Sequence, residues 1–215
     1  TDEAHLVYNF ALPPLILHTF RTGDTGALRE WAAQLKAPSD ATTFFNFIAS
    51  HDGLGVTPAR GLLPEEQVTA LVEMTLARGG KVSCKSNPDG SRSPYELNIS
   101  LFDAIHPPDT TDSALDVRRF LAAQFIMLSL AGVPGIYVHS LFGSRNWHRG
   151  MEDTGRPRTI NRRKFQRTWL ESELAEPQSL THRVFAGYRQ LLLARRSHRA
   201  FHPQSGQCVL RSPGT

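Results

Sequence analysis

The sequence is poor in the residues that define several large classes of protein. Its 215 residues include two cysteines, Cys84 and Cys208, which are too few for a disulfide scaffold or a four-cysteine zinc site. No apolar run approaches the roughly 20 residues that cross a membrane. The first residues show neither the basic nor the apolar stretch of a signal peptide. We therefore expect a cytoplasmic protein that has no membrane partner.

Lysine is scarce, and the charge is divided unevenly. Only four of the 24 cations are lysines; residues 1–140 carry a net charge of −5 and residues 141–215 carry +9. A basic half can bind nucleic acid, but these arginines are spread over a glycine-containing loop and a helix without a recognised motif. The alternative is that they pair with acidic residues of a missing part or of a partner subunit. We expect no nucleic-acid partner.

Short apolar segments alternate with helical ones along the chain. The strands are expected at about residues 5–10, 42–49 and 136–140, and the helices at 15–35 (interrupted near Gly23), 64–78, 115–131 and 180–196. Glycine, proline and serine predict a loop over 79–93, and a second, long basic loop is expected over 142–167. Strands that alternate with helices indicate an α/β fold with a parallel sheet.

One segment carries a recognisable pattern. Residues 43–63, TFFNFIASHDGLGVTPARGLL, resemble the end of the seventh barrel strand in the alpha-amylase superfamily of glycoside hydrolases. The continuation GLGV…RGL is similar to the sucrose phosphorylase-like branch. Four more segments agree in order, namely 3–15 with the sixth strand, 94–98 with a mobile active-site loop, 132–137 with the eighth strand and 158–162 with an Arg-Asp-Ile-Asn-Arg segment.

The resemblance implies the fold and a domain boundary. Residues 1–200 would be the C-terminal portion, about strands 6–8 with their helices, of a TIM (β/α)8 barrel, and 201–215 the start of a truncated C-terminal β domain. The nucleophilic Asp and the acid/base Glu of the family would both lie before Thr1. We therefore expect the chain alone to be inactive, with open sheet edges and an exposed apolar inner face. Self-association, as a homo-oligomer for example, would cover that face.

The resemblance also assigns a site. Asp52 would be the carboxylate that stabilises the transition state, and His51 would bind a sugar hydroxyl. Arg158 would bind substrate through its planar fork, as would Tyr95 and Glu96, where sucrose phosphorylase has Tyr-Gln. Taken by itself, the Asp-Gly pair at 52–53 also fits an ordinary turn, and the basic loop around Arg158 holds seven arginines.

The remaining polar residues give weaker indications. Arg162 is expected to be less involved with ligand than Arg158, and Asn98 to be a loop stabiliser or a ligand. His139 follows the last expected strand, where a packing role is favoured over a place in the site. His198 and His202 have the spacing of a helix-face metal site but no third ligand. We expect no metal and no cofactor, with inorganic phosphate as co-substrate.

The expected function is part of a retaining sugar phosphorylase or glucosyltransferase. Its substrate would be an α-glucoside (sucrose, sucrose 6′-phosphate, glucosylglycerol or glucosylglycerate), which phosphate cleaves to α-glucose 1-phosphate. Glu96 in place of Gln puts plain sucrose in doubt. The alternatives are an amylase-like α-glucoside hydrolase on the same scaffold, an inactive truncated chain and, from another class, a basic nucleic-acid-binding module.

Overall fold

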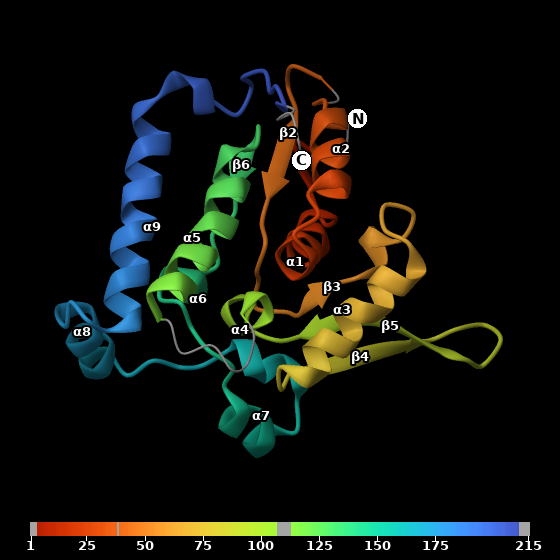
Figure 1. Ribbon diagram of the computed structural model, residues 1–215, viewed down its shortest axis with the longest axis vertical. Coiled ribbons are helices and arrows are strands. Elements are labelled where there is room, and N and C mark those ends of the chain that lie inside the picture. Colours follow the sequence, from red (N-terminus) through yellow and green to blue (C-terminus); the bar gives the residue numbers. More distant parts are fainter. Residues whose placement is uncertain (1–3, 38, 107–112, 211–215) are drawn as a thin grey trace.

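The chain forms two small sheets with helices packed around them (Figure 1). This computed structural model describes residues 4–37, 39–106 and 113–210. The first sheet is parallel and has the order β1-β2-β6, with β1 Leu6–Tyr8, β2 Thr43–Asn46 and β6 Val133–Pro134. The second is antiparallel and has the order β3-β5-β4, with β3 Leu54–Gly55, β4 Lys81–Ser86 and β5 Arg92–Asn98. It lies beyond the carboxyl end of β2 (Figure 1).

Helices connect the strands of the parallel sheet. The α-helices are α1 Leu12–Thr22, α2 Gly26–Gln34, α3 Glu65–Ala77, α4 Leu101–Ile105, α5 Ser113–Ser129, α6 Val138–Leu141, α7 His148–Thr154, α8 Arg167–Ala175 and α9 Leu180–Ser197, and the 3₁₀ turns are η1 Thr57–Ala59, η2 Pro157–Asn161 and η3 Arg199–Phe201. Prolines stand in the first turn of α1, and Gly23 ends that helix with a φ of 77°. The four predicted helical regions are thereby confirmed.

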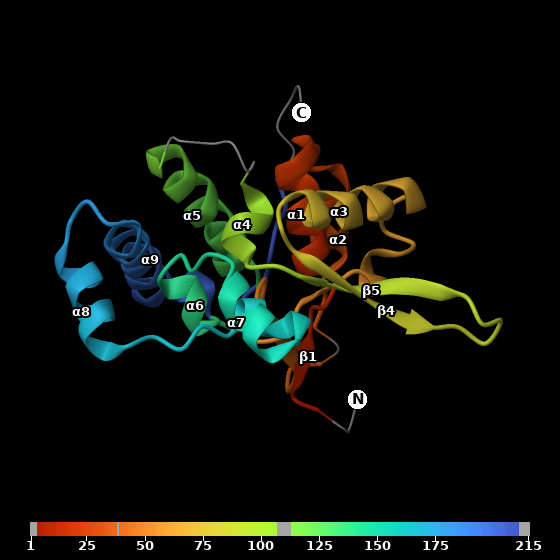
Figure 2. The ribbon, with the colours of Figure 1, turned by 90° about the horizontal axis from the view of Figure 1, so that it is seen from below.

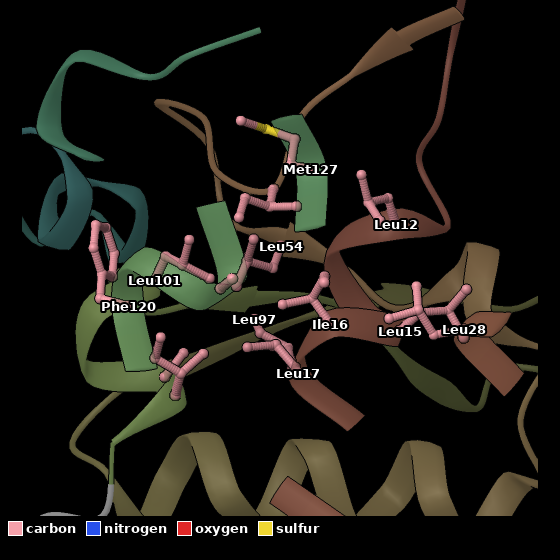
Figure 3. Packing of buried hydrophobic residues seen from close by; sticks show 14 of the residues in the cluster. Leu12, Leu15, Ile16, Leu17, Leu28, Leu54, Leu97, Leu101, Phe120 and Met127 are labelled. Atoms are coloured by element: carbon pink, nitrogen blue, oxygen red, sulfur yellow. The ribbon is translucent and has the colours of Figure 1, made fainter. Parts of the chain in front are cut away.

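The core lies between α1, the two sheets and the α5–α9 pair. Leu15, Ile16 and Leu17 of α1 are buried, and Figure 3 shows Ile16 beside Leu54 and Leu97 of the antiparallel sheet. On the other side, α9 runs along α5 (Figures 1 and 2). These helices approach closely at Gly187, where a Cβ atom would lie 2.3 Å from a methyl carbon of Leu121.

The parallel sheet presents a cluster of aromatic rings to solvent. Tyr8 and Phe10 of the β1 segment stack with their ring centroids 5.6 Å apart, and both contact Phe47, beyond β2. Tyr8 is 55% exposed and Phe10 is 54% exposed. A contiguous apolar patch of this kind is unusual on the exposed surface of a monomeric protein. The expectation of an exposed apolar face is therefore confirmed for the described residues.

The third predicted strand, 136–140, is wrong in position. Pairing with β2 occurs at Val133 and Pro134, and residues 138–141 form α6 instead. The apolar residues Ile136 and Val138 suggested a strand. However, β2 itself ends at Asn46, opposite Pro134, so the following residues have no strand to pair with.

The predicted loop over 79–93 is also wrong, because most of it is the hairpin of β4 and β5. The hairpin projects from the body in both ribbon views (Figures 1 and 2). At its tip the Asn87 N–H donates to the Ser91 carbonyl at 2.8 Å, and Gly79 and Gly80 stand just before β4. Val82 and Cys84 alternate with polar residues in β4, but this signal is short and lies among the glycine, proline and serine residues that indicate a loop.

Two other segments differ from expectation or stay open. The long loop expected over 142–167 contains α7 and η2, which are too short to show a helical period. The described residues 202–210 form turns and irregular chain without a strand, and 211–215 lie outside the described residues. The domain boundary near residue 200 stays a prediction.

Candidate active site

Asp52 stands beyond the carboxyl end of β2, the edge where parallel barrels carry their catalytic groups. After β2 the chain turns at Ser50, whose hydroxyl accepts a hydrogen bond from the Asp52 N–H at 3.1 Å. The Asn161 side-chain amide donates to the Asp52 carbonyl at 3.2 Å. These contacts fix the backbone, while the carboxylate itself is 35% exposed.

Two guanidinium groups hold one oxygen of this carboxylate. Nη1 of Arg158 and Nη2 of Arg162 each lie 2.9 Å from Oδ1 of Asp52. Arg162 also donates through Nε to the His51 carbonyl at 2.7 Å. Within the described residues, Oδ2 of Asp52 has no hydrogen-bond partner. The carboxylate is thus oriented through one oxygen and open at the other.

Arg158 connects Asp52 to a second carboxylate. Glu96 is only 5% exposed, and its two oxygens receive the Arg158 fork at 3.0 Å from Nε and 2.8 Å from Nη2. This is the bidentate arrangement that makes an arginine–carboxylate pair strong and directional. The hydrogen bonds to Glu96 raise the pKa of Arg158 above its ordinary value, so this guanidinium remains charged.

Backbone packing explains why Glu96 reaches Asp52. In the antiparallel sheet, Gly55 of β3 pairs with Glu96 of β5. Just before β3, a Cβ atom on Gly53 would lie 2.5 Å from both Cγ of Glu96 and the carbonyl oxygen of Leu97. Only glycine permits this approach. The Asp-Gly pair therefore does more than form a turn.

His51 and Tyr95 also lie at this place, in different settings. The His51 imidazole is 70% exposed, and its Nε2 lies 3.7 Å from Oδ1 of Asp52. Tyr95 is half-buried beside Glu96 on β5. The segment 94–98, expected as a mobile loop, is a paired strand, so that expectation is wrong. The five residues named from the sequence nevertheless lie in one neighbourhood.

No protein-family model matches the chain. A glucosylglycerate phosphorylase from Allomeiothermus silvanus is 53% identical over 212 residues, which are 98% of this chain and 38% of that protein. Another, from Spirochaeta thermophila, is 52% identical over the whole chain and 36% of its own length. The chain therefore spans little more than a third of these curated relatives.

A solved structure agrees in fold. The crystal structure of sucrose 6F-phosphate phosphorylase from Thermoanaerobacter thermosaccharolyticum matches with a TM-score of 0.75 at 22% identity, over 91% of this chain and 37% of that one. The resemblance to sucrose phosphorylase-like enzymes is confirmed. The described strands correspond to part of a TIM barrel, as the sequence predicts.

The sequence gives little indication of three further residues at this site. Arg162 holds Asp52 together with Arg158, and Asn161 holds the Asp52 backbone. Tyr137 donates its hydroxyl proton to the Asn161 carbonyl at 2.6 Å, and burial raises the pKa of that hydroxyl. The available signal was the segment 158–162, which resembles the family over its whole length. Asn98 is buried and donates to the Ser83 hydroxyl at 2.8 Å, in a strand and not a loop.

His139 lines a small cavity that also borders Asp52 and Tyr137. The cavity has a volume of about 20 Å³, which is room for about one water molecule. Nδ1 of His139 lies 3.0 Å from the Ser144 hydroxyl, and the ring packs between Tyr137 and Phe165. Burial lowers the pKa of His139, and the charge of Arg163 acts in the same direction. The packing role expected for His139 agrees with these contacts.

Part of the basic half of this phosphorylase-like chain pairs within the chain. Arginines at 145, 149, 158, 162 and 167 contact carboxylates of the chain itself. Expecting their partners outside the chain was therefore wrong for these five. In the described ranges no three His, Cys, Asp or Glu residues gather as a metal site would require, and no described helix combines the length and apolarity needed to cross a membrane.

Proposed function

We propose that a polypeptide of the relatives' full length containing these residues, called the complete enzyme below, is a retaining glucosylglycerate phosphorylase. It transfers the glucosyl group of glucosylglycerate to phosphate and yields α-glucose 1-phosphate and glycerate. The observation that supports this choice is the 53% identity to a glucosylglycerate phosphorylase over 98% of the chain. The identity to the sucrose 6F-phosphate phosphorylase structure is 22%. Glucosylglycerate is therefore favoured among the four substrates considered from the sequence.

Asp52 is the central residue of the proposed mechanism. Its free Oδ2 accepts a hydrogen bond from a glucosyl hydroxyl, and its negative charge stabilises the positive charge that develops at the anomeric carbon. His51, exposed beside it, donates to another sugar hydroxyl. Arg158 keeps the carboxylate oriented. By the resemblance, Tyr95 borders the acceptor.

Bond making and breaking belong to two other carboxyl groups. A nucleophilic carboxylate attacks the anomeric carbon while a carboxylic acid protonates the departing glycerate oxygen. A phosphate oxygen then attacks the glucosyl-enzyme and releases the nucleophile. By the resemblance, both groups precede Thr1. Phosphate is thus a co-substrate and no cofactor is needed.

The location and partners follow from the same proposal. Phosphorolysis conserves a phosphorylated sugar, which a cytoplasmic enzyme retains in the cell. The remaining barrel strands, or a second copy, cover the aromatic patch around Tyr8 and Phe10. Nucleic acid has no part in this scheme.

The test is a substrate panel with the complete enzyme. We expect phosphate-dependent release of α-glucose 1-phosphate, fastest from glucosylglycerate among glucosylglycerate, glucosylglycerol, sucrose and sucrose 6′-phosphate. Residues 1–215 alone should release none above an Asp52→Ala control. Release of free glucose without phosphate would support the hydrolase instead. A clear preference for another glucoside would reject the proposed acceptor.

A further inference from the structure

The ion pair of Glu96 and Arg158 is the starting point. Each oxygen of Glu96 is engaged by the Arg158 fork, and the side chain is 7% exposed. A carboxylate so enclosed offers little to a substrate hydroxyl. The Arg158 fork is in turn the kind of donor that binds phosphate or carboxylate in a bidentate manner. Glu96 occupies it.

The charges in this group balance. Asp52 and Glu96 supply two negative charges, and Arg158 and Arg162 supply two positive ones. Without the charge of Glu96 the group would be positive, beside the carboxylate that is proposed to stabilise a developing cation. A positive surplus there opposes that stabilisation and attracts anions.

We propose that Glu96 is a positioning and specificity-determining residue, which fills the guanidinium fork of Arg158, excludes oxyanions from it and fixes it against Asp52. Glu96 acts through Arg158 and does not itself contact substrate. The exclusion of oxyanions rests on the ion pair alone, whereas the kinetic consequence also rests on the proposed function.

The Glu96→Gln substitution separates charge from shape. The amide has the size of the carboxylate, but it has no charge, and its NH2 group faces a guanidinium that cannot accept a hydrogen bond. One side of the Arg158 fork is then released. Glu96→Asp retains the charge and is its companion. Glu171→Gln is the matched control, because Glu171 pairs with Arg167 at 2.7 Å on the exposed surface of α8.

The first measurement is calorimetric titration of the complete enzyme with inorganic phosphate and, separately, sulfate. We expect Glu96→Gln to bind both anions about three- to tenfold more tightly than the unmodified enzyme. Glu96→Asp and Glu171→Gln should stay within about twofold. Unchanged or weaker anion binding in Glu96→Gln would overturn the proposal, whether or not the enzyme acts on glucosylglycerate.

The second measurement is steady-state phosphorolysis of glucosylglycerate. Glu96→Gln should lower kcat about tenfold and lower the KM for phosphate, while the KM for glucosylglycerate changes little. A substrate contact at Glu96 would raise the KM for glucosylglycerate instead. A merely structural role would not tighten phosphate binding. A raised KM for glucosylglycerate, or a KM for phosphate that does not fall, would reject the positioning role.

A double-mutant cycle identifies the route of the effect. If Glu96 acts only through Arg158, then adding Glu96→Gln to Arg158→Lys should cost less than about twofold in kcat. Losses that multiply would show an action independent of Arg158 and would contradict the proposal. If the unmodified enzyme does not act on glucosylglycerate, the proposed function is rejected. The anion titrations would still test whether Glu96 excludes oxyanions from the Arg158 fork.

Discussion

Two ion-pair clusters in this chain use the same chemistry for different ends. In one, Asp103 of α4 receives the Arg145 guanidinium at Oδ1, and the Asn146 N–H and Ser100 hydroxyl at Oδ2. In the other, Asp52 receives two guanidinium groups at Oδ1 and nothing at Oδ2 among the described residues. The side chain of Asp103 is 10% exposed and that of Asp52 is 35% exposed.

The difference shows how a structural carboxylate can be told from one available to a ligand. Asp103 has both oxygens satisfied, so it joins α4 to the segment after α6 and leaves nothing to bind. Asp52 has one oxygen satisfied, so its direction is set while its second oxygen stays available. Saturation of the acceptor, more than the presence of an arginine, separates the two roles.

The sharpest test of this contrast is Asp52→Asn in the complete enzyme. We expect kcat/KM for phosphorolysis to fall roughly 100- to 1000-fold, because the amide removes the charge that stabilises the transition state. The thermal unfolding midpoint should move little, since the carboxylate is partly exposed. Steady-state kinetics and calorimetry check the two parts. Near-normal turnover would remove Asp52 from its proposed role.

Asp103→Ala should show the reverse pattern. It leaves the Arg145 guanidinium and the Asn146 N–H without their acceptor, so we expect a loss of about 3 kcal/mol in the free energy of unfolding. Turnover per folded molecule should be retained. Denaturant titration measures the free energy of unfolding, and kinetics normalised to the concentration of folded enzyme measure the turnover. A variant that stays stable but loses activity would erase the distinction between the clusters.

A smaller effect is expected for Arg162→Lys. Lysine keeps a positive charge near Asp52 but cannot donate to Oδ1 and to the His51 carbonyl in one planar arrangement. Because Arg158 still holds Asp52, kcat should fall only about three- to tenfold. Kinetic constants for both substrates would show it. A loss as large as that of Asp52→Asn would mean that Arg158 alone does not hold the Asp52 carboxylate in place.

The smallest effect concerns pH and the segment that joins the clusters. His139 contacts Ser144, next to Arg145, and burial lowers its pKa below the ordinary 6.5. The folded state therefore favours the neutral ring, and stability present above pH 6.5 should decline as the pH falls through the lowered pKa. Unfolding midpoints at about pH 7.5 and about pH 5.5 should differ less in His139→Gln than in the unmodified enzyme. Equal differences would contradict this assignment.

Much of the fold could be predicted because its signals are local. The prolines at 13 and 14, Gly23 and the acidic residues Glu65 and Glu66 mark helix ends that the structure reproduces. Strand β2 was recognisable from its β-branched and aromatic residues. The hairpin of β4 and β5 was not, because its few apolar residues, such as Val82 and Leu97, lie among residues that are typical of a loop.

The sequence predicts which residues form the site but not which of them contact one another. Family resemblance indicated Asp52, His51, Arg158, Tyr95 and Glu96, and their functional roles stay predictions. That Glu96 and Arg158 form a closed bidentate pair depends on two segments separated by 62 positions, and no local pattern encodes such a contact. The second arginine on Asp52 was underestimated for the same reason.

Gly53 has a consequence for how such sites change over generations. Because a Cβ atom at this position would collide with Cγ of Glu96 and with the β5 backbone, replacements at 53 and 96 are not independent. Any new residue at 96 is constrained in size by the chain passing over it, and no substitution at 53 is tolerated before β5 has shifted. In a combinatorial library, functional variants at 96 should therefore retain glycine at 53.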